Sequence, residues 1–437
     1  MDKSVELKVQ ANEGNSQEMV AQKAVVDEKV KYGVITIYAV LVLLSAFAFN
    51  SPYEIITGMK NIVVAPSILV TDYMAVGNVG AALFNAGLLM VIAIAIAKVS
   101  KANMNGPVIA AILTIGGFAL FGKNIYNIWA IFLGVYLYAV AKKEKFSKFI
   151  LMAFFGTALG PVISQVTFGF GFSPMKAVVL ANLIGIIAGY VLPPLGTHFV
   201  KFHQGFNLYN IGFTAGIIGT FCMAIFRAFG LQNESTLIVA EGYNTVLGIY
   251  LIILFGSMTL VGLLFNNKTF RGYGKMMKQS GRAVADFVTS DGFGLSLINM
   301  GIVGIIATVY VILVKGELNG PTIGGVFTVA GFGAFGKHAK NIIPILIGVY
   351  LFSLLNIWDT NATGALLAAL FGTTLAPIAG QFGWISGIIA GFLHMAMVMN
   401  VGYLHGGMNL YNNGFSGGIV AAALVPVLES FKSNKEE

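Results

Sequence analysis

Long apolar runs alternate with short polar stretches along almost the whole chain of 437 residues. Most runs approach about 20 residues, the length that an α-helix needs to cross the hydrocarbon of a bilayer, whereas the strands of a membrane barrel would alternate in polarity over about 10 residues. The pattern predicts an all-α, polytopic membrane bundle. Candidate spans cover residues 32–50, 77–98, 107–122, 126–141, 149–168, 174–194, 207–228, 241–265, 292–314, 320–336, 341–357, 362–380, 384–403 and 408–428.

These segments form two series of seven, and the two series repeat in sequence. The triplet Asn-Gly-Pro at 105–107 returns at 319–321, and Phe-Gly-Lys at 121–123 returns at 335–337, both at an offset of 214 residues. Further along, Asn-Leu-Tyr-Asn occurs at 207–210 and at 409–412. Register kept over such a length indicates two homologous halves.

The duplication and the flanking polar residues predict four parts of the chain. We expect a polar cytoplasmic N-terminal tail over residues 1–31, a first membrane repeat over 32–230, a second membrane repeat over 241–430, and a short C-terminal tail over 431–437.

Basic loops indicate how the halves are oriented. An odd number of crossings per half places the second half upside down, and positively charged loops stay on the cytoplasmic side. If the N-terminus is cytoplasmic, two basic loops fall inside while their repeat mates, near Asp359 and between Glu54 and Asp72, are poor in Lys and Arg. The basic loops contain Lys142, Lys143, Lys145 and Lys148, and Lys268, Arg271, Lys275, Lys278 and Arg282. Inverted repeats place both basic loops on the cytoplasmic side, so the charge pattern predicts that the two halves are inverted.

Composition removes several other classes of protein. The chain is 57% hydrophobic and only 10% charged, with a mean hydropathy of +0.82, so water is not its main solvent. The net charge of +8 lies mostly between apolar runs and reflects topology, so we expect no nucleic-acid partner. Cys222 is the only cysteine, which excludes an intramolecular disulfide.

The segments that follow the two Asn-Gly-Pro triplets are too short and too rich in glycine to be ordinary spans. Paired short segments at matching places in two halves are typical of discontinuous helices around a transport site. The first N–H groups of such a helix lack internal partners, so we predict that Asn105, Gly106, Asn319 and Gly320 contribute to substrate binding. The alternative is a short, tilted span whose glycines serve only close packing.

Lys123 and Lys337 are the only cations placed identically in both repeats within apolar surroundings. A lysine inside a membrane bundle is costly unless it meets an anion, backbone carbonyls or water, so these two predict an anionic solute. Alternatively, each lysine extends to the interface from a helix end.

Gln165 and Gln381 follow Pro161 and Pro377, each of which removes one helix hydrogen bond. We predict that these amides bind a polar substrate. The alternative, that they only join helices together, is equally open.

Matched polar residues also lie at the ends of spans. Asp72 and Asp286 precede matched spans, and their two interpretations are helix capping and coupling to an ion. His203, Asn207, His405 and Asn409 mark the two Asn-Leu-Tyr-Asn blocks, as helix caps or as the mouths of a pathway.

No motif for a cofactor or for catalysis is present. The remaining histidines do not pair at zinc-ligand spacing, and no Gly-x-x-x-x-Gly-Lys-Ser/Thr sequence occurs. We therefore expect no enzyme activity, no catalytic residue, no metal and no cofactor.

The paired Asn-Gly-Pro, Phe-Gly-Lys and Asn-Leu-Tyr-Asn blocks resemble an uncharacterised bacterial membrane family with a duplicated domain of unknown function. The resemblance implies a bacterial plasma (inner) membrane location and transfers no substrate. The Tyr-Asn pair in the last block is also similar to the motif of urea transporters, which are inverted repeats, at the level of fold only.

Together these features predict a secondary transporter of a small polar or anionic solute. One alternative is a passive channel for a neutral solute of the urea or ammonia type. A second alternative is a membrane enzyme or assembly factor that transports nothing. The expected partners are the lipid bilayer and the solute, with a coupling ion (H⁺ or Na⁺) and a second copy of the chain left open.

Overall fold

The computed structural model describes residues 26–233, 237–355 and 357–433. Within them, all regular secondary structure is helical, apart from one isolated bridge between Thr71 and Ile238. Within this part, ten helical segments are long and apolar enough to cross a bilayer, and the chain is therefore a multi-pass membrane protein. Large apolar side chains remain exposed on the outer faces of these segments, for example Ile37 and Leu41, and imply contact with lipid. Most of the predicted N-terminal tail, residues 1–25, lies outside the described residues, as do residues 434–437 of the C-terminal tail.

Among the described residues, the first half contains ten α-helices. They are α2 (Glu28–Phe49), α3 (Pro52–Val64), α4 (Tyr73–Val76), α5 (Val79–Val99), α6 (Gly106–Phe118), α7 (Trp129–Ala141), α8 (Ile150–Gly156), α9 (Gly160–Ser164), α10 (Pro174–Phe199) and α11 (Asn210–Ala228). Short helical turns η1 (Phe146–Lys148), η2 (Thr157–Leu159) and η3 (Gln165–Gly169) flank or join α8 and α9.

The second half repeats this order. It contains α12 (Asn244–Phe265), α13 (Tyr273–Met276), α14 (Phe287–Ser290), α15 (Phe293–Leu313), α16 (Gly320–Phe332), α17 (Ala339–Ser353), α18 (Thr363–Gly372), the turn η4 (Thr373–Leu375), α19 (Ala376–Phe382), α20 (Trp384–His405) and α21 (Asn412–Ser433).

The structure changes the number of crossings that the sequence predicted. Each half has five long spans among the described residues, and the other two apolar segments of each half form the shorter helices α6 and α7, or α16 and α17. The 13 residues of α6 extend about 20 Å, less than the hydrocarbon thickness of about 30 Å. Seven crossings per half is therefore wrong, although the number of long spans remains odd.

Each short pair begins and ends on one face of the molecule. Lys101, which precedes α6, lines the same surface pocket of about 560 Å³ as Lys148, which follows α7. In the second half, Lys315 before α16 and Thr360 after α17 line one pocket of about 710 Å³. A helix pair that begins and ends on one side adds no net crossing.

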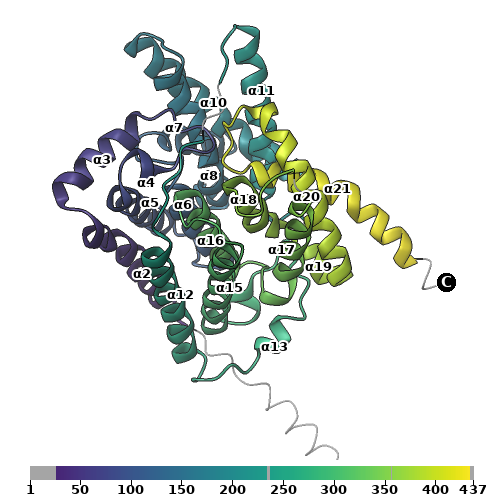
Figure 1. Cartoon of the computed structure of the whole chain (residues 1–437). Helices are drawn as coiled ribbons and strands as arrows, with labels where there is room; N and C mark the ends of the chain where they lie inside the picture. The colour runs from purple at the N-terminus through teal and green to yellow at the C-terminus, as the bar shows by residue number, and fades with distance from the viewer. Residues whose placement is uncertain (1–25, 234–236, 356, 434–437) are drawn as a thin grey trace, which may run out of the picture.

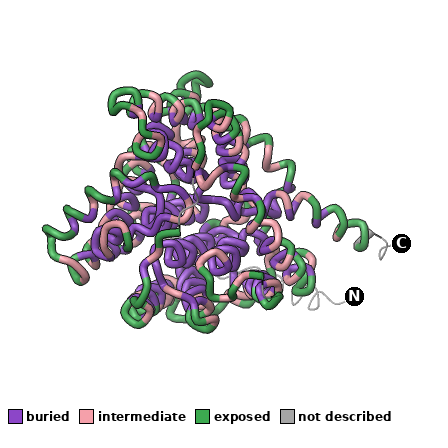
Figure 2. The backbone as a smooth tube through the Cα atoms, turned by 45° about the horizontal axis from the view of Figure 1, so that its top comes forward, coloured by how far each residue is buried: buried purple, intermediate pink, exposed green. Residues whose placement is uncertain are grey.

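The two shortest apolar helices lie at the centre of the bundle. Figure 1 shows α6 and α16 enclosed by the longer helices, and the central tube in Figure 2 is almost uniformly buried. Every residue of α6 and of α16 is buried. Around them, α2 packs on α5 and α7 on α10, and the second half repeats these pairs as α12 on α15 and α17 on α20.

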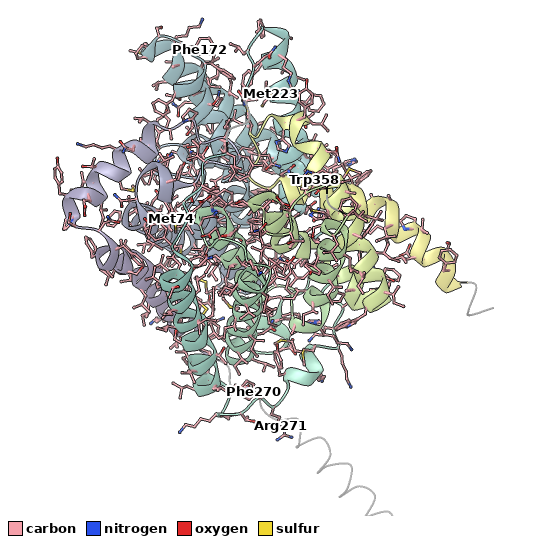
Figure 3. All side chains as sticks on the ribbon, in the orientation of Figure 1. Met74, Phe172, Met223, Phe270, Arg271 and Trp358 are labelled. Carbon is pink, nitrogen blue, oxygen red and sulfur yellow. The ribbon has the colours of Figure 1, made fainter. Side chains whose placement is uncertain are left out.

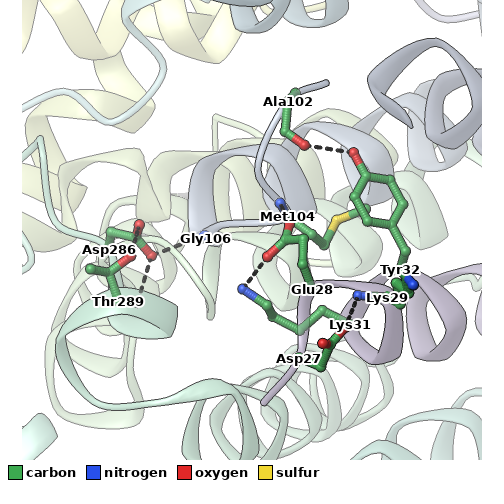
Figure 4. Close-up of polar contacts among 10 residues, drawn as sticks. All are labelled: Asp27, Glu28, Lys29, Lys31, Tyr32, Ala102, Met104, Gly106, Asp286 and Thr289. Carbon is green, nitrogen blue, oxygen red and sulfur yellow. Dashed lines mark hydrogen bonds and ion pairs between the residues drawn. The ribbon is translucent and has the colours of Figure 1, made fainter. Parts of the chain in front are cut away.

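Two hydrogen bonds to α2 hold the segment that leads into α6. The Glu28 side chain at the start of α2 accepts a hydrogen bond from the backbone N–H of Met104, and the Tyr32 hydroxyl donates to the Ala102 carbonyl at 2.8 Å (Figure 4). The first span therefore holds the loop from which the central helix of its own half begins.

Candidate functional site

The central helices α6 and α16 run in opposite directions at close range. A Cβ added to Gly117 of α6 would lie 2.6 Å from the carbonyl oxygen of Gly324 in α16. At the repeat-related position, a Cβ on Gly331 of α16 would lie 3.1 Å from the carbonyl oxygen of Ala110 in α6. Glycine is needed at both places because a side chain would push the helices apart.

Both helices begin with the predicted asparagine as a cap. The Asn105 side chain accepts from the backbone N–H of Val108 at 3.1 Å, and the Asn319 side chain accepts from that of Thr322 at 3.1 Å. The proline that follows each glycine fits the first turn of a helix, because its missing N–H would be unpaired there in any case.

Two aspartates cap the same helices from the opposite half of the chain. Asp286 accepts from the backbone N–H of Gly106 at 2.9 Å (Figure 4), and Asp72 accepts from the backbone N–H of Gly320. Asp72 is fully buried and also accepts from the N–H groups of Met74 and Ala240, each at 2.8 Å. In this structure, aspartate oxygens therefore accept from the helix N–H groups that the sequence analysis assigned to substrate binding.

Lys123 and Lys337 lie just beyond the C-terminal ends of α6 and α16 and have no exposed surface. Equivalent asparagines hold their backbones: Asn85 donates to the Lys123 carbonyl at 2.7 Å, and Asn299 donates to the Lys337 carbonyl at 2.7 Å. In the part of the chain described, the ion pairs are Lys31 with Glu28 and Lys148 with Glu144, so neither buried lysine meets a carboxylate.

The two ammonium groups have different partners. Lys337 Nζ donates to the Tyr209 hydroxyl and, at 2.7 Å, to the hydroxyl of Thr373, which lies midway along the span Thr363–Phe382. Among the described residues, Lys123 Nζ has one hydrogen bond, to the Phe154 carbonyl at 3.4 Å, and it lies over the Phe118 ring, 5.1 Å from the centroid. The lysine side chains therefore point toward mid-depth of the bundle, which excludes the alternative of extension to the interface in this structure.

Eight aromatic rings surround the two lysines, in four pairs related by the repeat. Ring centroids of Phe118 and Tyr411 are 4.5 Å apart, and those of the equivalent Phe332 and Tyr209 are 4.7 Å apart. The rings of Tyr209 and Tyr411 meet each other at 4.9 Å. We call this set the aromatic cage: Phe118, Phe121, Phe155, Tyr209, Phe332, Phe335, Phe371 and Tyr411.

The asparagines of the Asn-Leu-Tyr-Asn blocks place these tyrosines. Asn207 accepts from the Tyr209 N–H at 3.2 Å and donates to the Gly414 carbonyl in the other half at 2.9 Å. Asn409 accepts from the Tyr411 N–H at 3.0 Å and donates to the Gly212 carbonyl at 3.3 Å. The blocks thus join the starts of α11 and α21 reciprocally and direct one tyrosine from each into the cage.

Comparison with known proteins identifies a family without a described activity. The model of the family described as a protein of unknown function (DUF1576) matches residues 51–228 and 265–430, which is more than half of the chain. The chain belongs to this DUF1576 family. No curated protein and no solved structure matches it.

The two matched stretches of the DUF1576 model follow the two halves of the bundle. Both include a short central helix, a cage lysine and an Asn-Leu-Tyr-Asn block, whereas α2 and nearly all of α12 lie outside the match. The residues that converge at the centre are therefore those that the family model contains.

The predicted histidines of this family member do not reach the cage. His203 pairs with Asn210 at 3.0 Å and His405 pairs with Asn412 at 2.8 Å, at equivalent places in the two halves. Burial lowers the pKa of His203, which lies in the loop between α10 and α11, although its hydrogen bond to Asn210 opposes this shift. This histidine is therefore neutral at pH 7.

The two predicted glutamines lie in different surroundings. Gln165 is buried at the start of the π-helical turn η3, and its side-chain oxygen has no hydrogen-bond partner in the structure as described. Gln381 is exposed near the end of α19. The structure does not bring them together.

The sequence alone missed most of the cage. The signal for Tyr209 and Tyr411 was present, because both lie in the repeated block, but a tyrosine near a helix end is typical of the membrane surface. Thr373 lies in a Phe-Gly-Thr triplet that repeats residues 155–157, yet nothing in the sequence distinguishes its hydroxyl. Phe118 and Phe332 could not be separated from lipid-facing phenylalanines, since nothing in a continuous apolar run marks which face is buried.

Proposed function

We propose that this protein is a secondary transporter that carries a small polar or anionic solute across the bacterial plasma membrane. The observation that carries this proposal is a pair of repeat-related, fully buried lysines that meet no carboxylate. A buried ammonium group is costly when it lacks an anionic partner, and a bound anion would supply one.

Inverted topology supports the same proposal. With five long spans per half, and with α6–α7 and α16–α17 each beginning and ending on one side, equivalent loops of the two halves would lie on opposite sides of the membrane. The basic loops around Lys145 and Arg271 then share the cytoplasmic side with the N-terminus. Figure 3 places Arg271 at the end of the molecule opposite Phe172, as this arrangement requires.

The contacts between the halves fit alternating access. The aromatic cage lies on the boundary between the halves, and α6 and α16 approach each other closely there at Gly117 and Gly324. Halves that meet through small residues and reciprocal caps can rock against each other around a fixed central site. The complete burial of both lysines corresponds to a closed state.

Solute flux into proteoliposomes tests this function. We expect uptake of a small anion that saturates with concentration and depends on an ion gradient, and we expect Lys123→Gln and Lys337→Gln to reduce uptake by more than about tenfold. Lys340→Gln is the matched control, because Lys340 follows Lys337 closely but is exposed.

The same experiment separates the alternatives. Flux that neither saturates nor needs a gradient would indicate a passive channel and overturn the carrier mechanism. Absence of flux for charged and neutral small solutes alike would favour a protein that transports nothing.

A further inference from the structure

The aromatic cage is close to symmetric in its rings but not in its polar groups. On one side, the ammonium group of Lys337 donates to Tyr209 and Thr373. On the other side, the one hydrogen bond of the Lys123 ammonium group among the described residues is to a carbonyl at 3.4 Å, and the group also lies over the Phe118 ring face, 5.1 Å from the centroid. The Tyr411 hydroxyl approaches Thr114 without a hydrogen bond of ordinary geometry. Repeat symmetry would otherwise pair Lys123 with Tyr411, as it pairs Lys337 with Tyr209.

We infer that Lys123 and Tyr411 form a half-site for one small monovalent oxyanion, a carboxylate or a nitrate-like ion, while Lys337 is held by Tyr209 and Thr373. This inference rests on the proposed function and specifies it. Tyr411 has only 1% of its surface exposed and Lys123 has none, so their donors face the protein interior and not water. Buried donors without good acceptors are rare in proteins and mark a place where a ligand completes the hydrogen bonding.

The surroundings favour a single charge. One ammonium group balances one negative charge, and a dianion at this half-site would retain an uncompensated charge among buried rings. An ammonium group and a phenol hydroxyl together offer donors to the two oxygens of a carboxylate.

The equivalent half-site in the other repeat consists of Lys337 and Tyr209. It can bind an anion only when the Lys337 ammonium group no longer donates to Tyr209 and Thr373. The rings of Tyr209 and Tyr411 are in contact at 4.9 Å, so an anion released from one tyrosine lies next to the other. The two half-sites would thus be used in turn as the halves rock.

The repeat supplies a matched pair of variants for the test. The full chain is purified in detergent, and its unfolding temperature is measured against increasing sodium formate and sodium nitrate, with sodium sulfate at equal ionic strength as the reference. We expect formate or nitrate to raise the unfolding temperature of the wild type, and Tyr411→Phe to weaken the apparent affinity by about tenfold, the effect of one lost hydrogen bond to a charged group. Tyr209→Phe, the same substitution in the other half, should change the affinity by less than about twofold or increase it, because it releases Lys337.

The outcomes are distinct. If the two variants weaken the anion affinity equally, or if Tyr209→Phe weakens it more than Tyr411→Phe does, the half-site is overturned while an anion carrier remains in place. A wild-type protein that gains no stability from either monovalent anion beyond sulfate contradicts the anionic site and the half-site together. Because Tyr411→Phe removes no well-formed hydrogen bond, misfolding is not expected to obscure the comparison; Lys123→Gln, which should also abolish the response, provides a second variant.

Discussion

The carboxylate of Asp286 accepts a hydrogen bond from the backbone N–H of Gly106 at 2.9 Å, so a residue of the second half caps the central helix of the first half. Asp72 does the same for Gly320 in the opposite direction. Each half therefore completes the hydrogen bonding of the other, and separation of the halves would expose both helix ends.

These caps predict unequal losses of stability. Asp286→Ala should lower the free energy of unfolding by about 1 kcal/mol, the usual cost of losing a cap. Asp72→Ala should cost more, about 1–3 kcal/mol, because Asp72 is fully buried and its removal leaves three buried N–H groups unpaired. Denaturant unfolding in micelles measures both values. The control is Asp359→Ala at an exposed loop position, and equal effects of all three variants would contradict the role of the caps.

The asymmetry of the cage predicts that equivalent tyrosines differ in their contribution to stability. Tyr209→Phe should lower the free energy of unfolding by about 1.5–3 kcal/mol, because it removes the hydrogen bond from the Lys337 ammonium group. Tyr411→Phe should change it by less than about 0.5 kcal/mol, since the Tyr411 hydroxyl has no well-formed partner to lose. Denaturant unfolding without added anion is the measurement. A larger loss for Tyr411→Phe would show that the arrangement of hydrogen bonds at the cage is the reverse of the one described.

Close contact between the central helices predicts that a single methyl group is harmful. Gly117→Ala would place a Cβ 2.6 Å from the Gly324 carbonyl oxygen and should cost about 1–3 kcal/mol through overpacking. The matched control is Gly256→Ala in α12, where no atom lies within 4 Å of the new Cβ. Because alanine favours helix over glycine, the control should be neutral or stabilising by up to about 1 kcal/mol. Thermal unfolding of the two variants, side by side, distinguishes packing from helix propensity.

Inverted repeats predict that equivalent loops lie on opposite sides of the membrane. In a Cys222→Ser background, Lys145→Cys and Asp359→Cys each place a single cysteine at an exposed position of repeat-related loops. A membrane-impermeant thiol reagent should label Asp359→Cys in intact cells and label Lys145→Cys only after permeabilisation. Labelling of both from the same side would mean parallel halves and would remove the topological support for the proposed carrier.

The buried histidine between α10 and α11 predicts a loss of stability in acid. Because burial lowers the pKa of His203 below its ordinary value of 6.5, the unfolded chain takes up a proton that the folded chain does not. Stability should therefore fall as pH drops below about 6.5, and His203→Gln should remove this part of the fall. Unfolding temperatures between about pH 7.5 and about pH 5 test this, with His198→Gln at an exposed position as the control. An unchanged pH profile in His203→Gln would exclude the contribution of this group.

The sequence predicted the membrane bundle and its two halves because both follow from one-dimensional patterns. Span length is set by the thickness of hydrocarbon, and repeated triplets keep their register without any knowledge of folding. The same patterns could not decide how far a short apolar segment penetrates. The segments at 126–141 and 341–357 were counted as crossings, yet α7 and α17 are short helices, and the pairs α6–α7 and α16–α17 each begin and end on one face of the molecule.

The candidate site was predicted in part. Lys123 and Lys337 were singled out because a cation repeated in apolar surroundings is conspicuous in a sequence, and the structure buries both. Gln165 and Gln381 were singled out because each follows a proline that removes a helix hydrogen bond. Only Gln165 is buried, because the local pattern does not show which side of a helix faces the centre.

By itself, the sequence determined a duplicated, multi-pass helical protein with matched lysines, aspartates and asparagines, since composition and periodicity respond directly to the solvent around each helix. The tertiary structure decided that Asp72 and Asp286 cap helices of the opposite half. It also decided that the Tyr209 hydroxyl accepts from Lys337, while the Tyr411 hydroxyl has no hydrogen bond of ordinary geometry among the described residues. These contacts join residues more than 100 positions apart, and their geometry depends on how the two halves pack, which no local pattern along the chain contains.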